Sequence, residues 1–265
     1  MPTKYVHQGD LAIHYEHTGG TTLPGVPPPL DRGHALLFLH GAGGTGRLWS
    51  RQLAHFGAAH SPVAIDLPGH GRSSGLLGPE STSEAAAIVA AVLERLSAPP
   101  AVVVGHGLGG KIALQLALEH AACVRAVVTI GTTAGSPGAE AEIEGLSEVV
   151  AGRRGQAFDT PFFAATPDVA VIRELWAEMV KTDPRVRLGD LRAHEAADLR
   201  PRLKDVRVPA LVLHGEEDRY CSRSCAEEMA ASIPGARLVL VPGAGHAAQL
   251  EQAEQVNRAI EEWLA

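Results

Sequence analysis

The sequence predicts an α/β fold in which a mostly parallel central sheet is flanked by helices. Short apolar runs alternate with longer segments of helical periodicity, which is the pattern of repeated strand–helix units. Most of these runs are continuously apolar, as expected of strands that are covered on both faces. With 265 residues, the chain is long enough for one such domain with an inserted excursion.

The expected strands begin with an alternating, half-exposed run at Leu11–Tyr15. A stretch rich in Pro and Gly, Thr21–Gly33, is then interpreted as a surface loop or hairpin insertion. The remaining strands are expected at Ala35–His40, Val63–Asp66, Ala101–Val104, Ala126–Ile130, Ala210–His214 and Arg237–Val241.

Helical periodicity fills most of the intervals between these strands. Ser81 and Glu84 have the spacing of a capping box, which marks the start of one of these helices. The expected helices are Trp49–His60, Glu84–Leu96, Gly109–His120, Ser222–Ser232 and Ala253–Leu264.

The long interval between Gly131 and Val208 has no strand pattern. A structureless loop of that length is uncommon in a compact domain. Because Val169–Lys181 and Gly189–Asp198 have helical patterns, we expect a helical cap over the carboxyl edge of the sheet. The predicted division is a core of residues 1–131 and 209–265 and a cap of residues 132–208.

Composition narrows the function classes. Hydrophobic residues make up 45% and charged residues 20%, which is typical of a soluble globular protein. A net charge of -7 and the lack of Lys/Arg clusters argue against nucleic acid as a partner. No apolar run is long enough to cross a membrane and Met1–Gly9 lacks a signal-peptide pattern, so a cytoplasmic protein is expected.

The cysteines are an odd set of three: Cys123, Cys221 and Cys225. They lack the spacing of a zinc site, so the sequence favours reduced thiols, with no metal and no cofactor. The expected partner is a small-molecule substrate, and a homo-oligomer is left open.

The strongest functional signal is a buried strand that enters a helix through the turn Gly105-His106-Gly107-Leu108-Gly109-Gly110. This pattern is typical of a nucleophile elbow, a tight turn in which small residues must flank the central one. Gly105, Gly107 and Gly110 match the spacing G-x-G-x-x-G, but the segment lies in the middle of the chain and, apart from Glu119, no acid follows at the distance that a dinucleotide site requires. The central position of the elbow is Gly107.

Here the chain resembles the α/β-hydrolase family, and five motifs in the right order carry the resemblance. The resemblance implies an α/β-hydrolase fold with a nucleophile on the elbow, a histidine, an acid and an oxyanion hole. The five segments are Leu37–Gly44, Asp66–Ser73, Val102–Gly110, Val212–Asp218 and Pro242–His246.

The resemblance implies that His246 is the catalytic histidine and Asp218 the acid that orients its ring. Glu216 and Glu217 are nearby rivals for the role of the acid. The backbone amides of Ala42 and Leu108 would form the oxyanion hole.

The family normally has a serine at the nucleophile position, where this chain has Gly107. Glycine accepts the turn's positive φ, so the elbow should form. The acyl-enzyme route is lost, since there is no hydroxyl to deprotonate. Three explanations stay open: a variant whose serine was replaced, an enzyme in which His246 and Asp218 activate water or move a proton, and a ligand-binding protein without catalysis.

The expected function is hydrolysis of a small, partly apolar substrate: an ester, a lactone or a C–C bond next to a ketone. A lyase, isomerase or cofactor-free oxygenase is the alternative reaction class. An apolar cavity under the cap would be lined by aromatic and apolar side chains, although cap–core packing explains them equally well. These residues are Phe158, Phe162, Phe163, Trp176 and Met179.

Other polar residues near the motifs are interpreted as structural. His40 and His106 lie in buried turns after strands, where a hydrogen-bonded histidine without a catalytic role is common. Asp66, His70 and Arg72 are expected to hold their own turn together.

Overall fold

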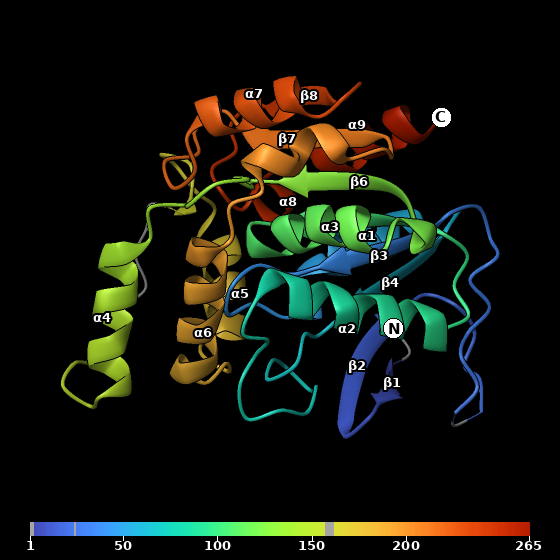
Figure 1. The fold of residues 1–265 in the computed structure, drawn as a ribbon, viewed down its shortest axis with the longest axis horizontal. Helices are drawn as coiled ribbons and strands as arrows, with labels where there is room; N and C mark the ends of the chain where they lie inside the picture. The colour runs from blue at the N-terminus through green and yellow to red at the C-terminus, as the bar shows by residue number, and fades with distance from the viewer. Residues whose placement is uncertain (1–2, 24, 157–161) are drawn as a thin grey trace.

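The computed structural model describes residues 3–23, 25–156 and 162–265, and its framework is one eight-stranded sheet (Figure 1). The strand order is β1-β2-β4-β3-β5-β6-β7-β8, with β1 and β2 antiparallel and the strands from β4 to β8 parallel. The predicted α/β-hydrolase fold is therefore confirmed. The strands are β1 (Thr3–Gln8), β2 (Leu11–His17), β3 (Ala35–Leu39), β4 (Ser61–Ile65), β5 (Ala101–His106), β6 (Val124–Ile130), β7 (Ala210–Gly215) and β8 (Arg237–Val241).

Helices cover both faces of the sheet (Figure 1). One face packs against α2 (Thr82–Arg95), α3 (Leu108–Glu119) and α7 (Arg223–Ser232). The other packs against α1 (Ser50–Phe56) and α9 (Ala253–Leu264). Strand β3 alternates between the two layers, because successive side chains of a strand point to opposite faces. Shorter elements are η1 (Gly46–Trp49), η2 (Ala121–Cys123), η4 (Arg200–Asp205) and α8 (Ala248–Glu251).

The interval between β6 and β7 contains α4 (Glu140–Val150), α5 (Val169–Met179) and α6 (Pro184–Ala196). In Figure 1 these helices lie at the end of the sheet toward which the parallel strands point. Of the residues described between β6 and β7, none forms a strand. The domain boundaries at 131/132 and 208/209 stay a prediction.

Besides the short elements η2, η4 and α8, strand β1 and helix α4 were not anticipated from sequence. Strand β1 is a polar edge strand, and only Val6 of its described side chains is buried, so its apolar pattern is weak. Helix α4 fully buries only Leu146, and the apolar stripe that it forms with the partly buried Ile143 and Val149 is narrow.

Of the two hydrogen bonds that define the predicted capping box, one is present. Ser81 Oγ accepts a hydrogen bond from the Glu84 amide at 3.1 Å. The Glu84 carboxylate instead accepts from the amide of Glu80, one residue before the cap. The start of α2 is therefore fixed as expected, by a slightly different set of bonds.

A buried lysine joins α3 to the segment between β6 and β7. Lys111 of α3 is fully buried, and its ammonium donates to the carbonyls of Gly135, His194 and Ala197 at 2.6 to 2.8 Å. Burial lowers the pKa of Lys111 to about 8. One cation thereby holds the segment after β6 and the end of α6 against α3.

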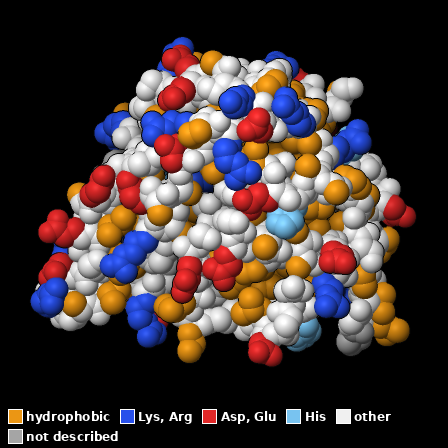
Figure 2. All heavy atoms as spheres, viewed as in Figure 1, with side chains coloured by type: hydrophobic (Ala, Val, Ile, Leu, Met, Phe, Trp, Pro, Cys, Tyr) orange, Lys and Arg blue, Asp and Glu red, His pale blue; other side chains and the backbone are white. Residues whose placement is uncertain are grey.

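The surface shows no dominant charge on the face in Figure 2, where Lys and Arg side chains are interspersed with Asp and Glu. Among the residues that the structure describes, no helix combines the length and apolar character that a membrane crossing requires.

Candidate active site

The turn after β5 leads into α3, and at this turn backbone segments lie very close to one another. A Cβ on Gly105 would lie 2.2 Å from the backbone of Gly109, and one on Gly109 would lie 2.3 Å from the carbonyl oxygen of Leu39. Only glycine fits these two positions. At the centre, Gly107 has φ +51° and ψ −114°, and α3 begins at the next residue. The backbone of a nucleophile elbow is thus present without its side chain.

His246 and Asp218 come together from two loops at the carboxyl end of the sheet. His246 Nδ1 lies 2.9 Å from Asp218 Oδ2, and the other carboxylate oxygen accepts from the amides of Tyr220 and Cys221. Burial alone would raise the pKa of Asp218, but the bonds from His246 and Cys221 outweigh it and hold that pKa below its ordinary value. The carboxylate is therefore ionised and only accepts, which places the ring proton on Nδ1.

Because the ring proton is on Nδ1, the Nε2 atom of His246 is unprotonated and its lone pair is available. A Cβ on Gly107 would meet only this atom within 4 Å, at 3.6 Å. The space beside the Gly107 α-carbon therefore opens directly onto a ring nitrogen able to act as a base.

The rival acids Glu216 and Glu217 are exposed. Glu217 instead accepts a hydrogen bond from the amide of Ala165. Of the three acidic residues in this loop, Asp218 is the one in contact with His246.

The predicted oxyanion donors are unpaired amides at the same pocket. Leu108 is the first residue of α3, where the amide has no intrahelical acceptor. Among the described residues, neither its amide nor that of Ala42 has a hydrogen-bond acceptor, and both residues line the pocket. This geometry is compatible with the predicted role, which stays a prediction.

The loop that carries Ala42 is held by the cap segment. Asp190 of α6 accepts from the amide of Gly43 at 2.8 Å, and Thr182 donates to the Gly43 carbonyl at 2.9 Å. The position of the Ala42 amide therefore depends on α6 being in place.

His40 has the buried hydrogen bonds of a structural histidine. Its Nδ1 donates to the carbonyl of Gly41, and its Nε2 accepts from the amide of Leu67. Burial lowers the pKa of His40 to about 4, so the ring is neutral near pH 7.

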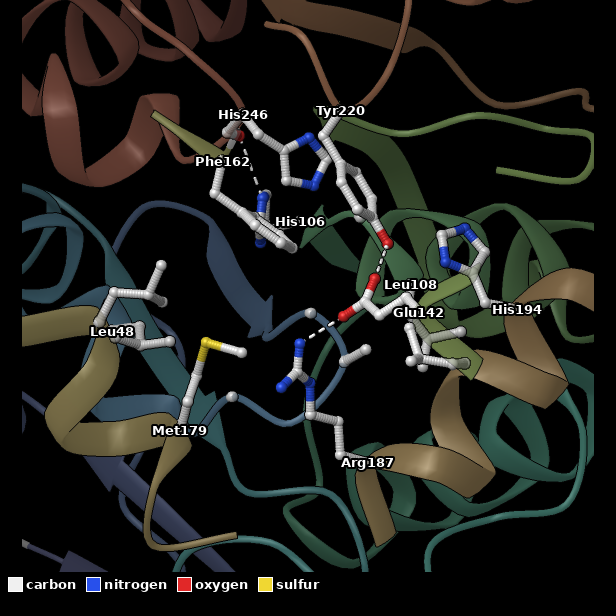
Figure 3. Close-up of a pocket in the computed structure, with 16 residues that line it drawn as sticks. Leu48, His106, Leu108, Glu142, Phe162, Met179, Arg187, His194, Tyr220 and His246 are labelled. Atoms are coloured by element: carbon white, nitrogen blue, oxygen red, sulfur yellow. Dashed lines mark hydrogen bonds and ion pairs between the residues drawn. The ribbon is translucent and has the colours of Figure 1, made fainter. Parts of the chain in front are cut away.

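His106 stands directly beneath His246, with ring centroids 4.7 Å apart (Figure 3). It donates from Nε2 to the His246 carbonyl at 3.1 Å. Burial lowers the pKa of His106 to about 3, and the neighbouring His246 adds to this effect. A ring that stays neutral and holds the backbone of His246 is well suited to a structural role.

Asp66 holds its own turn, as expected, because it accepts from the amides of Gly46 and Arg72 and from the ring of His14. The contribution of Arg72 to this turn is its backbone amide. His70 also holds the turn, because its Nδ1 donates to the carbonyl of Pro68 at 3.0 Å, and its Nε2 additionally contacts Asp190 of α6 at 2.8 Å.

A small pocket of about 40 Å³ lies at the Gly107 turn. Phe162 and Met179 line it, as the sequence predicts (Figure 3). Phe163 does not, because its side chain is fully buried in an apolar cluster with Leu175. Trp176 is also absent from the lining, since it is rotated by one residue from the helix face that Leu175 and Met179 share. Phe158 lies outside the described residues.

Four polar side chains of the pocket were missed by the sequence reasoning. Tyr220 donates to Glu142 at 2.9 Å, and Glu142 forms an ion pair with Arg187 (Figure 3). His194 of α6 is buried, and its Nε2 has no partner among the described residues. Tyr220 could have been placed near the site from sequence, because it follows Asp218 by two residues. Glu142, Arg187 and His194 lie on α4 and α6, where no sequence motif marks them.

A second pocket of about 300 Å³ adjoins the first and shares four of its lining residues. These form the wall between the two spaces, and Tyr220 stacks on one of them with ring centroids 4.4 Å apart. The four shared residues are Glu142, Phe162, Arg187 and Tyr220.

Comparison with known proteins assigns the family. The model of the alpha/beta hydrolase family matches residues 36–259. The chain belongs to this family. At this level it is a hydrolase, with the fold and motif order that the sequence predicts.

Relatives within the family differ in the reaction that their names describe. A protein described as a candidate carbamate hydrolase, RutD, from Azorhizobium caulinodans is 30% identical, over 92% of this chain and 91% of its own. The 2-hydroxy-6-oxononadienedioate/2-hydroxy-6-oxononatrienedioate hydrolase of Burkholderia vietnamiensis is 27% identical, over 96% and 91%. A solved hydrolase from Pseudomonas aeruginosa is 26% identical with a TM-score of 0.83, over 99% and 98%.

Proposed function

We propose that this hydrolase cleaves a small, partly apolar ester or lactone, or a C–C bond next to a ketone, with a water molecule that His246 activates directly. The observation that carries the proposal is the unobstructed approach of His246 Nε2 to the space beside Gly107. With no hydroxyl at residue 107, water is the remaining nucleophile that this base can serve.

For an ester, water attacks the carbonyl carbon directly, and no covalent enzyme intermediate forms. The water oxygen forms a bond to the carbonyl carbon while its proton passes to His246 Nε2. The negative charge that develops on the carbonyl oxygen is stabilised by the amides of Ala42 and Leu108. The ester C–O bond then breaks, and the imidazolium, held by Asp218, returns its proton to the leaving oxygen.

The pocket supports a small substrate with one polar group away from the reacting carbon. A volume of 40 Å³ is room for about three water molecules, at about 10–15 Å³ each. Burial lowers the pKa of His194 well below its ordinary value, and the Lys111 ammonium adds to this effect. The neutral ring therefore offers its unpaired Nε2 to a substrate hydroxyl or carbonyl.

The proposal is tested by turnover of the unaltered protein. Short p-nitrophenyl esters, small lactones, a carbamate and a vinylogous diketone are assayed with the protein and with His246→Ala. We expect turnover of at least one substrate, reduced about 10²–10⁴-fold by the substitution. Turnover that is indifferent to His246 would contradict the mechanism.

Ligand binding without turnover is the outcome that would favour the ligand-binding alternative. In that case, the affinity for a substrate analogue should be the same in the unaltered protein and in His246→Ala, as measured by calorimetry.

A further inference from the structure

A second group of potential ligands lies behind the catalytic acid. His214, at the end of β7, and Asp218 and Cys221, in the loop that follows, each offer one ligand atom, and these atoms lie within 4.8 Å of one another. His214 Nδ1 lies 3.9 Å from Asp218 Oδ2. The sequence predicts no metal here, because the spacing of the cysteines alone does not reveal that His214 faces them.

His214 is the observation that points to a ligand. Its ring is 1% exposed, and neither nitrogen has a hydrogen-bond partner among the described residues. A buried polar group without a partner costs about 1–3 kcal/mol, so such groups are rare in folded proteins. The nitrogen nearest the cluster is the one that faces Asp218.

The ligand chemistry selects the class of cation. An imidazole nitrogen, a thiolate and a carboxylate oxygen are the ligands that zinc binds in three-ligand sites with one open position. Magnesium and calcium prefer oxygen ligands and do not suit a thiolate. Tetrahedral zinc requires about 3.4 Å between its nitrogen and oxygen ligands, so the side chains must close by roughly 0.5–1 Å.

We propose that a zinc-like divalent cation binds His214, Asp218 and Cys221 and inhibits the hydrolase by taking the carboxylate oxygen on which His246 depends. On binding, the Cys221 thiol releases its proton to solvent, and the neutral His214 ring coordinates through Nδ1. Oxidation states do not change, and the only co-reactant is the cation.

Inhibition follows from a single shared atom. Asp218 Oδ2 accepts from His246 at 2.9 Å and is also the oxygen nearest His214. A cation on that oxygen competes with the His246 hydrogen bond that fixes the ring's tautomer. Because the side chains of His214 and Asp218 are buried, the cation enters through a local opening, and inhibition should develop with time. This part of the inference rests on the proposed function.

Binding is tested by itself with cobalt(II), a spectroscopic substitute for zinc. Metal-free unaltered protein is titrated with Co²⁺, and we expect a near-ultraviolet thiolate-to-cobalt band that saturates at one equivalent and disappears on addition of Zn²⁺. Cys221→Ala and His214→Gln should lose the band, whereas Cys123→Ala, a thiol in η2, should keep it. No band in the unaltered protein, or an equal band in folded Cys221→Ala, would overturn the site.

Inhibition is tested by preincubation with Zn²⁺, with each protein compared with its own metal-free rate. We expect at least a tenfold, time-dependent loss of turnover in the unaltered protein and in Cys123→Ala, which a chelator reverses, and little loss in Cys221→Ala. Cobalt binding with turnover unchanged by zinc would overturn the inhibition. Failure of the proposed function looks different, because turnover would then be missing before metal is added and the cobalt titration would be unaffected.

Discussion

The two sides of the candidate site differ in what they retain. On one side, His246 and Asp218 keep the ring, the carboxylate and the amides that hold the carboxylate. On the other, the turn at Gly107 keeps the backbone of an elbow, including its positive φ and its adjoining free amide, but has no side chain. The proposed base therefore has all its partners, whereas residue 107 has no side chain that could act as a nucleophile.

This difference shows that the elbow's shape does not depend on its central residue. Its tightness is determined by the flanking glycines, since a Cβ on Gly105 or Gly109 would collide with backbone atoms. A Cβ on Gly107 collides with nothing and meets only His246. A substitution at residue 107 can therefore change the chemistry of the site without changing the fold.

The largest effect is expected from placing a hydroxyl side chain at residue 107. Gly107→Ser should raise p-nitrophenyl ester turnover on the order of 10⁴-fold, because it supplies a hydroxyl within reach of His246. Gly107→Ala is the matched control and should show no gain. The gain should vanish in Gly107→Ser/His246→Ala, and a gain that survives there would show that the two sides do not cooperate.

Gly107→Ser should also be less stable, by about 1–3 kcal/mol, because a side chain at φ +51° is strained. Urea denaturation of Gly107→Ser and Gly107→Ala should give similar losses, since both add a Cβ at the same place. Equal stability of all three proteins would mean that the turn has relaxed.

The pair His246–Asp218 is tested with Asp218→Asn, which keeps the shape of the acid but removes its charge. We expect turnover to fall on the order of 10³-fold, because an amide neither stabilises the imidazolium nor fixes Nδ1 as the protonated nitrogen. Glu217→Gln, in the same loop, should leave turnover unchanged. Similar losses in both variants would show that Asp218 is not the acid.

The stability of the fold at acid pH should depend on His40, the buried neutral histidine that directly follows β3. Burial lowers the pKa of His40 to about 4, so between pH 6.5 and 4 the unfolded chain takes up a proton that the folded protein does not. Stability from this residue is complete above pH 6.5 and is lost as the pH falls through 4. His40→Gln should flatten this fall by on the order of 3 kcal/mol. Urea denaturation from pH 7 to 4 measures it, with the exposed His7→Gln as the control that keeps the original slope.

The smallest expected effect concerns the wall between the two pockets. Glu142→Ala removes the acceptor of Tyr220 and the partner of Arg187, and should join the inner space to the outer one. Bulky esters should gain a few-fold in kcat/KM relative to acetate, which corresponds to about 1 kcal/mol or less. Glu140→Ala, also on α4, is the matched control. An unchanged preference would mean that the wall does not limit access.

Sequence predicted the parts that rest on local patterns. Sequence patterns located seven of the eight strands. Six were found as continuous apolar runs, which are typical of parallel strands, and β2 was found from its alternating pattern. The turn around Gly105 was found from its glycines, and the loops of Asp218 and His246 were found from their resemblance to the family's motifs. Strand β1 was missed because its polar residues at the sheet edge carry little periodicity.

Sequence could not predict contacts that depend on how the cap helices meet the core. Arg187, Glu142 and His194 reach the pocket from α4 and α6, and their neighbours in sequence give no motif. Which face of α5 lines the pocket also required the structure, since Leu175 and Trp176 are adjacent but point apart. The nearness of His214 to Asp218 and Cys221 was overlooked because it depends on how the loop after β7 folds back, which no spacing in the sequence reveals.

The most direct test of the account is whether a hydroxyl placed at residue 107 becomes a nucleophile. Folded Gly107→Ser is treated with a small fluorophosphonate, and the adduct is located by mass spectrometry of its peptides. We predict one adduct, on residue 107, that does not form in Gly107→Ala and forms far more slowly in Gly107→Ser/His246→Ala. A folded Gly107→Ser protein that resists the reagent, or that reacts equally well without His246, would contradict the convergence of base and amides on that position.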